Sequence, residues 1–127
     1  MEKDTQGSLT ILVIDDDDRV RNLLKDILIY GGHQVIEASD GILGMKCFEE
    51  HKFDMVLIDL GMPIMNGWEV AKWVKKNRPK IPVGLITGWE VHSEGERIED
   101  LGVDLIINKP FQVNEILEAV NQFVDLH

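Results

Sequence analysis

Short apolar runs, each followed at once by polar or turn-forming residues, constrain the fold of this chain more than any other feature of its sequence. The clearest run is Met55–Asp59, four apolar residues that end on a carboxylate, with Gly61 and Pro63 just beyond it. A run this short, closed by glycine and proline, is typical of a strand that is buried on both faces. Similar runs lie at residues 9–14, 34–38, 81–86 and 103–107, so the sequence predicts five strands.

The segments between these runs have the three- and four-residue apolar spacing of amphipathic helices. Gly31-Gly32 ends the first helix, the third runs from Asn66-Gly67 to Pro79, and others are predicted near residues 42–51, 90–101 and 116–124. The helix near residues 90–101 is the weakest, because Gly95 costs about 1 kcal/mol relative to alanine and the apolar stripe is thin. Strands that alternate with helices predict an α/β fold with a parallel sheet and helices on both faces.

Composition and charge restrict the class of protein. With 127 residues, 44% of them hydrophobic, the chain is long enough for one domain and one core. Its net charge of -10 repels phosphates, which argues against nucleic acid or an anionic membrane as a direct ligand. The single cysteine, Cys47, can form neither an internal disulfide nor a cysteine-rich zinc site, which indicates a reducing compartment.

The start of the chain is polar and lacks the basic and apolar pattern of a signal peptide. We expect a flexible tail at residues 1–8, followed by one domain at residues 9–127. No apolar run is long enough to span a membrane. These features predict a cytoplasmic protein.

Polar residues follow four of the predicted strands, at positions where parallel strands bring their carboxyl ends to one edge of the sheet. They are Asp15, Asp16, Asp59, Thr87 and Lys109. Two carboxylates about 4 Å apart repel by about 4 kcal/mol at an effective dielectric constant of about 20, so clustered carboxylates require a cation. Oxygen ligands favour Mg²⁺, which leaves sites for water and phosphate oxygens. The pattern therefore predicts phosphoryl transfer, with Asp59 as the nucleophile.

The acidic run also has a plain structural interpretation, because carboxylates stabilise the start of a helix. We accept that interpretation for Asp17 and Asp18, but not for Asp15 and Asp16, which directly follow a strand. A calcium-binding EF-hand loop is excluded, because its sixth position requires glycine and counting from Asp15 gives Val20.

Other polar residues have plain interpretations of their own. Taken alone, Thr87 fits a helix cap and Lys109 fits an ordinary surface lysine, although their conjunction with the three aspartates does not. The histidines are scattered, and we expect them at the surface, at positions 33, 51, 92 and 127.

Together, these motifs resemble the receiver domain of bacterial two-component response regulators, from Leu9 to about Val124. The matching motifs are Ile11–Asp17 with Arg21 downstream, Asp59–Pro63 through Asn66-Gly67, Leu85–Gly88, and Asn108–Phe111. The resemblance implies a flavodoxin-like, doubly wound sheet of five parallel strands in the order 2-1-3-4-5. It also implies a cis peptide bond between Lys109 and Pro110.

The resemblance implies a Mg²⁺ site at the sheet edge. Asp16, Asp59 and the backbone carbonyl of Gly61 would bind the ion directly, and Asp15 would act through a metal-bound water. Asp59 would accept a phosphoryl group from a phosphohistidine of a histidine kinase or histidine phosphotransfer protein.

The remaining roles implied by the resemblance belong to Lys109 and Thr87, which would contact phosphoryl oxygens. Such a domain is not an enzyme in the usual sense, since it catalyses only its own phosphorylation and dephosphorylation. A homodimer or an output domain is a possible further partner.

Three positions bear on how such a domain would signal. Many receivers carry an aromatic residue three positions before the lysine, where this chain has Ile106. We therefore expect signalling through the loop after Thr87 and the weak helix that follows. Gly61 and Trp89 lie two residues beyond Asp59 and Thr87, where Gly61 leaves access for water and Trp89 is expected to slow hydrolysis.

Two alternatives to the phosphoacceptor remain open on the sequence. One is a docking or dimerisation module of the same fold that does not use phosphate. The other is a phosphatase of the haloacid dehalogenase type, although its general-acid aspartate would be at the position of Gly61.

Overall fold

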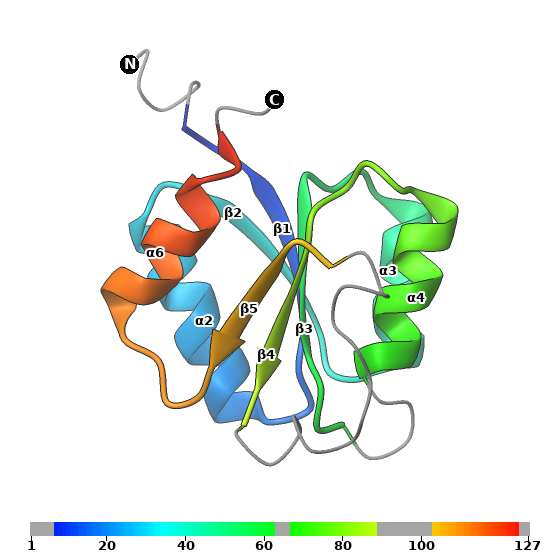
Figure 1. The fold of residues 1–127 in the computed structure, drawn as a ribbon, viewed down its shortest axis with the longest axis horizontal. Coiled ribbons are helices and arrows are strands. Elements are labelled where there is room, and N and C mark those ends of the chain that lie inside the picture. Colours follow the sequence, from blue (N-terminus) through cyan, green and yellow to red (C-terminus); the bar gives the residue numbers. More distant parts are fainter. Residues whose placement is uncertain (1–6, 63–66, 89–102, 125–127) are drawn as a thin grey trace.

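The computed structural model describes residues 7–62, 67–88 and 103–124. It contains one sheet of five parallel strands in the order β2-β1-β3-β4-β5 (Figure 1). The strands are β1 (Thr10–Ile14), β2 (Gln34–Ala38), β3 (Met55–Asp59), β4 (Val83–Thr87) and β5 (Leu105–Asn108). The predicted flavodoxin-like fold class and strand order are confirmed.

Within the described residues, two helices cover each face of the sheet (Figure 1). Helices α2 (Asp18–Tyr30) and α6 (Val113–Asn121) pack on one face, and α3 (Gly41–Glu50) and α4 (Gly67–Asn77) pack on the other. The helix predicted near residues 90–101 lies outside the described residues, as do residues 1–6 of the predicted tail. The Lys109–Pro110 peptide bond is cis, as the resemblance implied.

The core is divided by the sheet into two layers, and β3 contributes to both. Val56 and Ile58 belong to the layer under α3 and α4, whereas Met55 and Leu57 belong to the layer under α2 and α6. All five residues of β3 are buried. A strand with apolar residues on both faces therefore positions Asp59 at its end, as the apolar run predicted.

Helix α2 begins and ends where its sequence predicts. The Asp17 side chain caps it, accepting hydrogen bonds from the backbone N–H groups of Arg19 and Val20 at 2.9 and 3.4 Å. Gly32, with φ of 93°, allows the turn that ends it. The interpretation of Asp17 and Asp18 as the start of a helix is confirmed.

The expectation that His33 lies at the surface is wrong. Its side chain is 4% exposed, and its Nδ1 accepts a hydrogen bond from the backbone N–H of Leu9 at 3.0 Å. The proton must then be on Nε2, which donates to Oδ1 of Asn121 at 3.1 Å. Burial lowers the pKa of His33, and the hydrogen bond with Asn121 only partly opposes this. His33, the residue before β2, thus links the residue before β1 to the end of α6.

Several boundaries differ slightly from the prediction; strand β5, for example, covers Leu105–Asn108 rather than residues 103–107. Strand β4 begins at Val83 rather than residue 81, because Pro82 has no N–H group to donate to the ladder. Helix α6 ends at Asn121, although Phe123 beyond it remains buried. Among the residues that the structure describes, no helix has the length and apolar character to span a bilayer.

Candidate functional site

The register of the sheet brings the predicted acidic residues together. Ile14 of β1 pairs with Ile58 of β3, so Asp15 and Asp59, the next residue on each strand, meet at the carboxyl edge. A carboxylate oxygen from each of Asp15, Asp16 and Asp59 lies within 4.8 Å of the other two. Asp15 and Asp59 are buried, whereas Asp16 is exposed. This is a spacing at which one cation can contact oxygens from all three side chains.

The surroundings of Asp15 disfavour the ionised form of its carboxyl group. One of its oxygens, Oδ1, accepts a hydrogen bond from the backbone N–H of Asp17 at 2.9 Å. The other, Oδ2, is buried and has no hydrogen-bond partner among the described residues. Burial raises the pKa of Asp15 to about 6; the Asp17 hydrogen bond opposes this and the charge of Asp59 adds to it. A buried, unpartnered carboxylate oxygen fits a site for a cation and the water molecules bound to it.

Lys109 supplies a positive charge beside Asp59. Its backbone N–H continues the β4–β5 ladder by donating to the Thr87 carbonyl at 2.8 Å, which fixes where the side chain starts. Its Nζ then donates to Asp59 Oδ1 at 3.0 Å. Burial lowers the pKa of Lys109, but the hydrogen bond and charge of Asp59 outweigh it, so the pKa is raised. Lys109 is therefore a stable cation, not a surface lysine without a partner.

Thr87 lies at the same edge but does not contact Asp59 through its hydroxyl. The residue is 1% exposed, and its Oγ1 donates to the carbonyl of Gly88 at 2.8 Å. The described structure therefore brings together the three aspartates and Lys109, with the Thr87 hydroxyl turned onto the adjacent backbone. A contact between Thr87 and a phosphoryl group stays a prediction.

Two glycines, Gly61 and Gly67, lie close to Asp59. Among the described residues, a Cβ at Gly61 would meet only Asp59 Oδ2, at 3.9 Å. A Cβ at Gly67 would lie 2.5 Å from the backbone oxygen of Asp59 and 2.9 Å from Cα of Leu60. The Asn66-Gly67 pair predicted only a helix start, yet Gly67 also lets α4 approach the end of β3.

Sequence reasoning gave no role to Arg21 and did not single out Glu37. The Arg21 side chain donates to the Asp15 backbone carbonyl at 2.8 Å and to Glu37 Oε1 of β2 at 3.2 Å, and it also pairs with Asp18. Arg21 was visible only as a part of the motif after the first strand. The spacing of residues in the sequence does not show that the Arg21 side chain would bind the backbone carbonyl of Asp15, six residues earlier.

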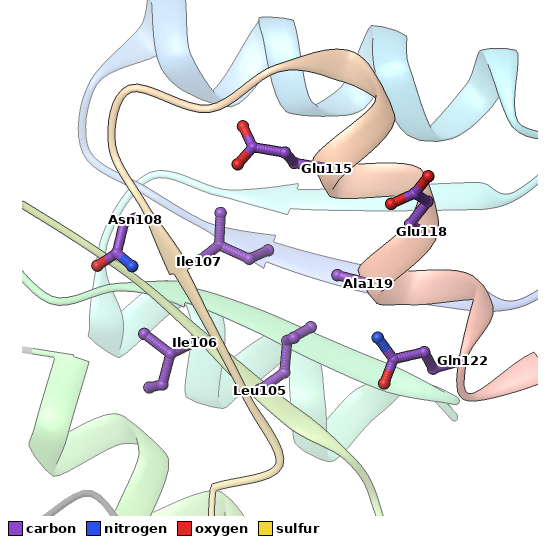
Figure 2. A pocket seen from close by; sticks show the side chains of 8 residues that line it. All are labelled: Leu105, Ile106, Ile107, Asn108, Glu115, Glu118, Ala119 and Gln122. Atoms are coloured by element: carbon purple, nitrogen blue, oxygen red, sulfur yellow. The ribbon is translucent and has the colours of Figure 1, made fainter.

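Ile106 lies on β5 with its side chain half-buried and packed against the core layer of α3 and α4. Figure 2 shows Ile106 and Asn108 on the side of β5 away from α6, and Leu105 and Ile107 on the side toward it. An open groove of about 320 Å³ lies between β5 and α6. Residues 105–108 of β5 form one side of it, and the other side is formed by Glu115, Glu118, Ala119 and Gln122. The Ile106 side chain is thus packed against the core, and it lacks the aromatic ring and the hydroxyl that a tyrosine would have at this position.

Comparison with known proteins assigns the chain to a family. Residues 11–121 match the response regulator receiver domain. The polar-differentiation response regulator DivK of Brucella anthropi is 26% identical over 117 residues, which are 91% of this chain and 95% of DivK.

Solved structures agree with this assignment. A response regulator receiver domain protein from Clostridium thermocellum has a TM-score of 0.86 at 27% identity, covering 92% of this chain and 94% of that one. The response regulator TrrA from Thermotoga maritima, in complex with Mg²⁺ and BeF, has a TM-score of 0.81 at 29% identity, covering 90% and 97%. The chain belongs to the response regulator receiver domain family.

Proposed function

We propose that this receiver domain accepts a phosphoryl group on Asp59 from a phosphohistidine of a histidine kinase or histidine phosphotransfer protein. The observation that carries the proposal is the arrangement of Asp59: its Oδ1 is bound by Lys109 Nζ at 3.0 Å, and its carboxylate shares an edge with Asp15 and Asp16. Membership of the family supports the same conclusion.

In the proposed reaction, a carboxylate oxygen of Asp59 attacks the phosphorus of the phosphohistidine. A P–O bond forms as the P–N bond breaks, and the histidine nitrogen keeps the electron pair and takes up a proton. Lys109 stays beside the group as it arrives, and its positive charge offsets the negative charge on the phosphoryl oxygens. Because Gly61 has no side chain, a donor or water would reach Asp59 Oδ2 from that side, where a Cβ would meet no other described residue within 4 Å.

The three carboxylates would hold Mg²⁺, which would neutralise charge on the transferring group. Asp16, Asp59 and the Gly61 carbonyl are the proposed direct ligands, with Asp15 acting through water. The unpartnered Oδ2 of Asp15 supports this assignment. Burial, with the charge of Asp59 adding to it, raises the pKa of Asp15, and cation binding would relieve the repulsion between Asp15 and Asp59.

The proposed domain is a switch that acts only on its own phosphorylation state. After phosphorylation the Thr87 hydroxyl would leave the Gly88 carbonyl and donate to a phosphoryl oxygen. Because Ile106 offers no aromatic ring or hydroxyl, we propose that the change spreads through the loop after Thr87 and the helix predicted near residues 90–101. Amide exchange with and without a phosphoryl mimic tests this route, and unchanged protection over residues 87–101 would contradict it.

Intact-mass measurement tests the proposed function. The protein is incubated with acetyl phosphate and Mg²⁺, alongside Asp59→Asn and a sample with chelator. Wild type is expected to gain one phosphoryl group, whereas Asp59→Asn and the chelated sample stay unmodified. Repeated turnover of the donor without stable modification would support a phosphatase, and the absence of any gain would support the docking module. A homodimer, an output domain and a cytoplasmic location stay predictions.

A further inference from the structure

The Arg21 guanidinium joins three parts of the chain next to the acidic cluster. One nitrogen, Nη1, donates to the Asp15 backbone carbonyl at 2.8 Å, and Nε donates to Glu37 Oε1 on β2 at 3.2 Å. The remaining nitrogen pairs with Asp18 in the first turn of α2. Only 14% of the Arg21 side chain is exposed. Its planar fork therefore has three partners: one just after β1, one on β2 and one on α2.

The contact with Asp15 fixes a specific part of the backbone. The Asp15 carbonyl and the Asp16 N–H belong to the same rigid peptide plane, so a hydrogen bond to the carbonyl sets the orientation of that plane. The Asp15 N–H on the other side is already held by the Ala38 carbonyl at 3.1 Å. Together these bonds restrict the direction in which the exposed Asp16 side chain leaves the end of β1.

The positive charge of Arg21 and its hydrogen bond to the Asp15 carbonyl have opposite expected effects on cation affinity. The guanidinium contacts the Asp15 carbonyl and so adds positive charge close to the acidic cluster, which would not be expected to favour cation binding if charge alone were important. Lys25 offers a matched comparison, because its Nζ also pairs with Glu37, at 3.3 Å to Oε2. The described contacts of Lys25 do not include Asp15. The two residues thus share an ion-pair partner and a charge, but only Arg21 touches the strand end.

We infer that Arg21 is a positioning residue for the Mg²⁺ site, acting through the Asp15–Asp16 peptide. This inference rests on the proposed function, since it assumes that Asp16 and Asp59 bind Mg²⁺. It assigns to Arg21 a role that its charge opposes. Outer groups that orient metal ligands typically contribute 10-fold or more to metal affinity.

Titration calorimetry with MgCl₂ alone, without a phosphodonor, tests the inference on wild type, Arg21→Ala and Lys25→Ala. Arg21→Ala is expected to weaken Mg²⁺ binding about tenfold, although it removes a positive charge. Lys25→Ala, which removes the same charge and an ion pair with the same glutamate, is expected to bind as tightly as wild type or more tightly. A circular-dichroism melt confirms that each variant is folded at the titration temperature.

Arg21→Lys keeps the charge but cannot reproduce the three-way fork. It is expected to bind Mg²⁺ more weakly than wild type, and it decides the question if Arg21→Ala does not fold. The inference would be overturned if the Arg21 variants bound Mg²⁺ as tightly as wild type, or if Lys25→Ala weakened binding to the same extent. Either result would leave the proposed function intact. Wild type that binds no Mg²⁺ would overturn the metal site of the proposed function, and the inference with it.

Discussion

At the edge of the sheet where the strands begin, the first edge, polar side chains have hydrogen-bond partners. At the edge where the strands end, the second edge, charged side chains lie close together. At the first edge, His33 joins Leu9 to Asn121, and Asp104 accepts hydrogen bonds from the Val83 N–H and from Lys75 at 2.9 and 3.0 Å. At the second edge, three carboxylates converge with Lys109 bound to one of them. One buried carboxylate oxygen, Oδ2 of Asp15, has no hydrogen-bond partner among the described residues.

The difference separates residues that stabilise the fold from residues that the fold holds in an unfavourable arrangement. A buried polar group with a partner contributes to stability, whereas a buried carboxylate near other carboxylates does not. Substitutions at the first edge should therefore lower stability and leave chemistry intact. Substitutions at the second edge should impair chemistry and, in some cases, increase stability.

The largest effect is expected for Lys109→Gln. Removing a positioned charge that stabilises a transferring group typically lowers the rate by about 100-fold. Phosphorylation from acetyl phosphate, followed by intact mass, should show this loss, while Mg²⁺ affinity measured by calorimetry should not fall. An unchanged phosphorylation rate would mean that the contact between Lys109 and Asp59 is only structural.

The next effect is expected for His33→Ala at the opposite edge. This change leaves the buried Leu9 N–H and the Asn121 oxygen without their partner, and it creates a cavity, so the free energy of unfolding should fall by about 2 kcal/mol. Urea denaturation gives this value. Asn121→Ala is the milder control, because it removes one of the two bonds. Phosphorylation of folded His33→Ala should match wild type, and a slower rate would break the separation between the edges.

Asp15→Asn is expected to increase the stability of the metal-free protein by about 1 kcal/mol, because it removes a buried carboxylate charge that lies near Asp59. The pKa of Asp15 is about 6 in the folded protein against 3.8 unfolded, so ionisation favours the unfolded state as the pH rises from 3.8 to 6. The gain should therefore be full above pH 6 and vanish below 3.8. Urea denaturation at several pH values, with chelator present, would contradict this if the variant were less stable throughout.

The smallest effect concerns pH at the first edge. The pKa of His33 is lowered from its ordinary 6.5, so the unfolded state takes up the proton first as the pH falls. The stability that His33 contributes should be present above pH 6.5 and be lost progressively below it. The difference in unfolding free energy between wild type and His33→Gln isolates this contribution, and a difference that stayed constant with pH would refute it.

Much of the fold could be predicted because apolar runs closed by turn-forming or acidic residues leave little freedom in where a strand ends. Strands β2 and β3 match the runs at residues 34–38 and 55–59. The burial of His33 could not be predicted, because it depends on Asn121, which lies 88 positions away. A single histidine between Gly32 and a short strand has no periodicity that would reveal such a contact.

The candidate site shows the same limit. The convergence of Asp15, Asp59 and Lys109 follows from parallel strands, which the alternation of strands and helices predicted, and from the strand order, which the resemblance implied. The contacts of Arg21 depend on the direction of its side chain and on Glu37 from another strand. Likewise, the pattern of the sequence does not predict that the Thr87 hydroxyl is oriented toward the Gly88 carbonyl.

The most direct test of the account is to locate the phosphoryl group. Wild type is phosphorylated with acetyl phosphate and Mg²⁺, reduced with borohydride, which converts an aspartyl phosphate to homoserine, and digested for tandem mass spectrometry. The account predicts homoserine at position 59 and unmodified aspartate at positions 15 and 16. Homoserine at 15 or 16, or at no aspartate of a protein shown to be folded and Mg²⁺-bound, would contradict it.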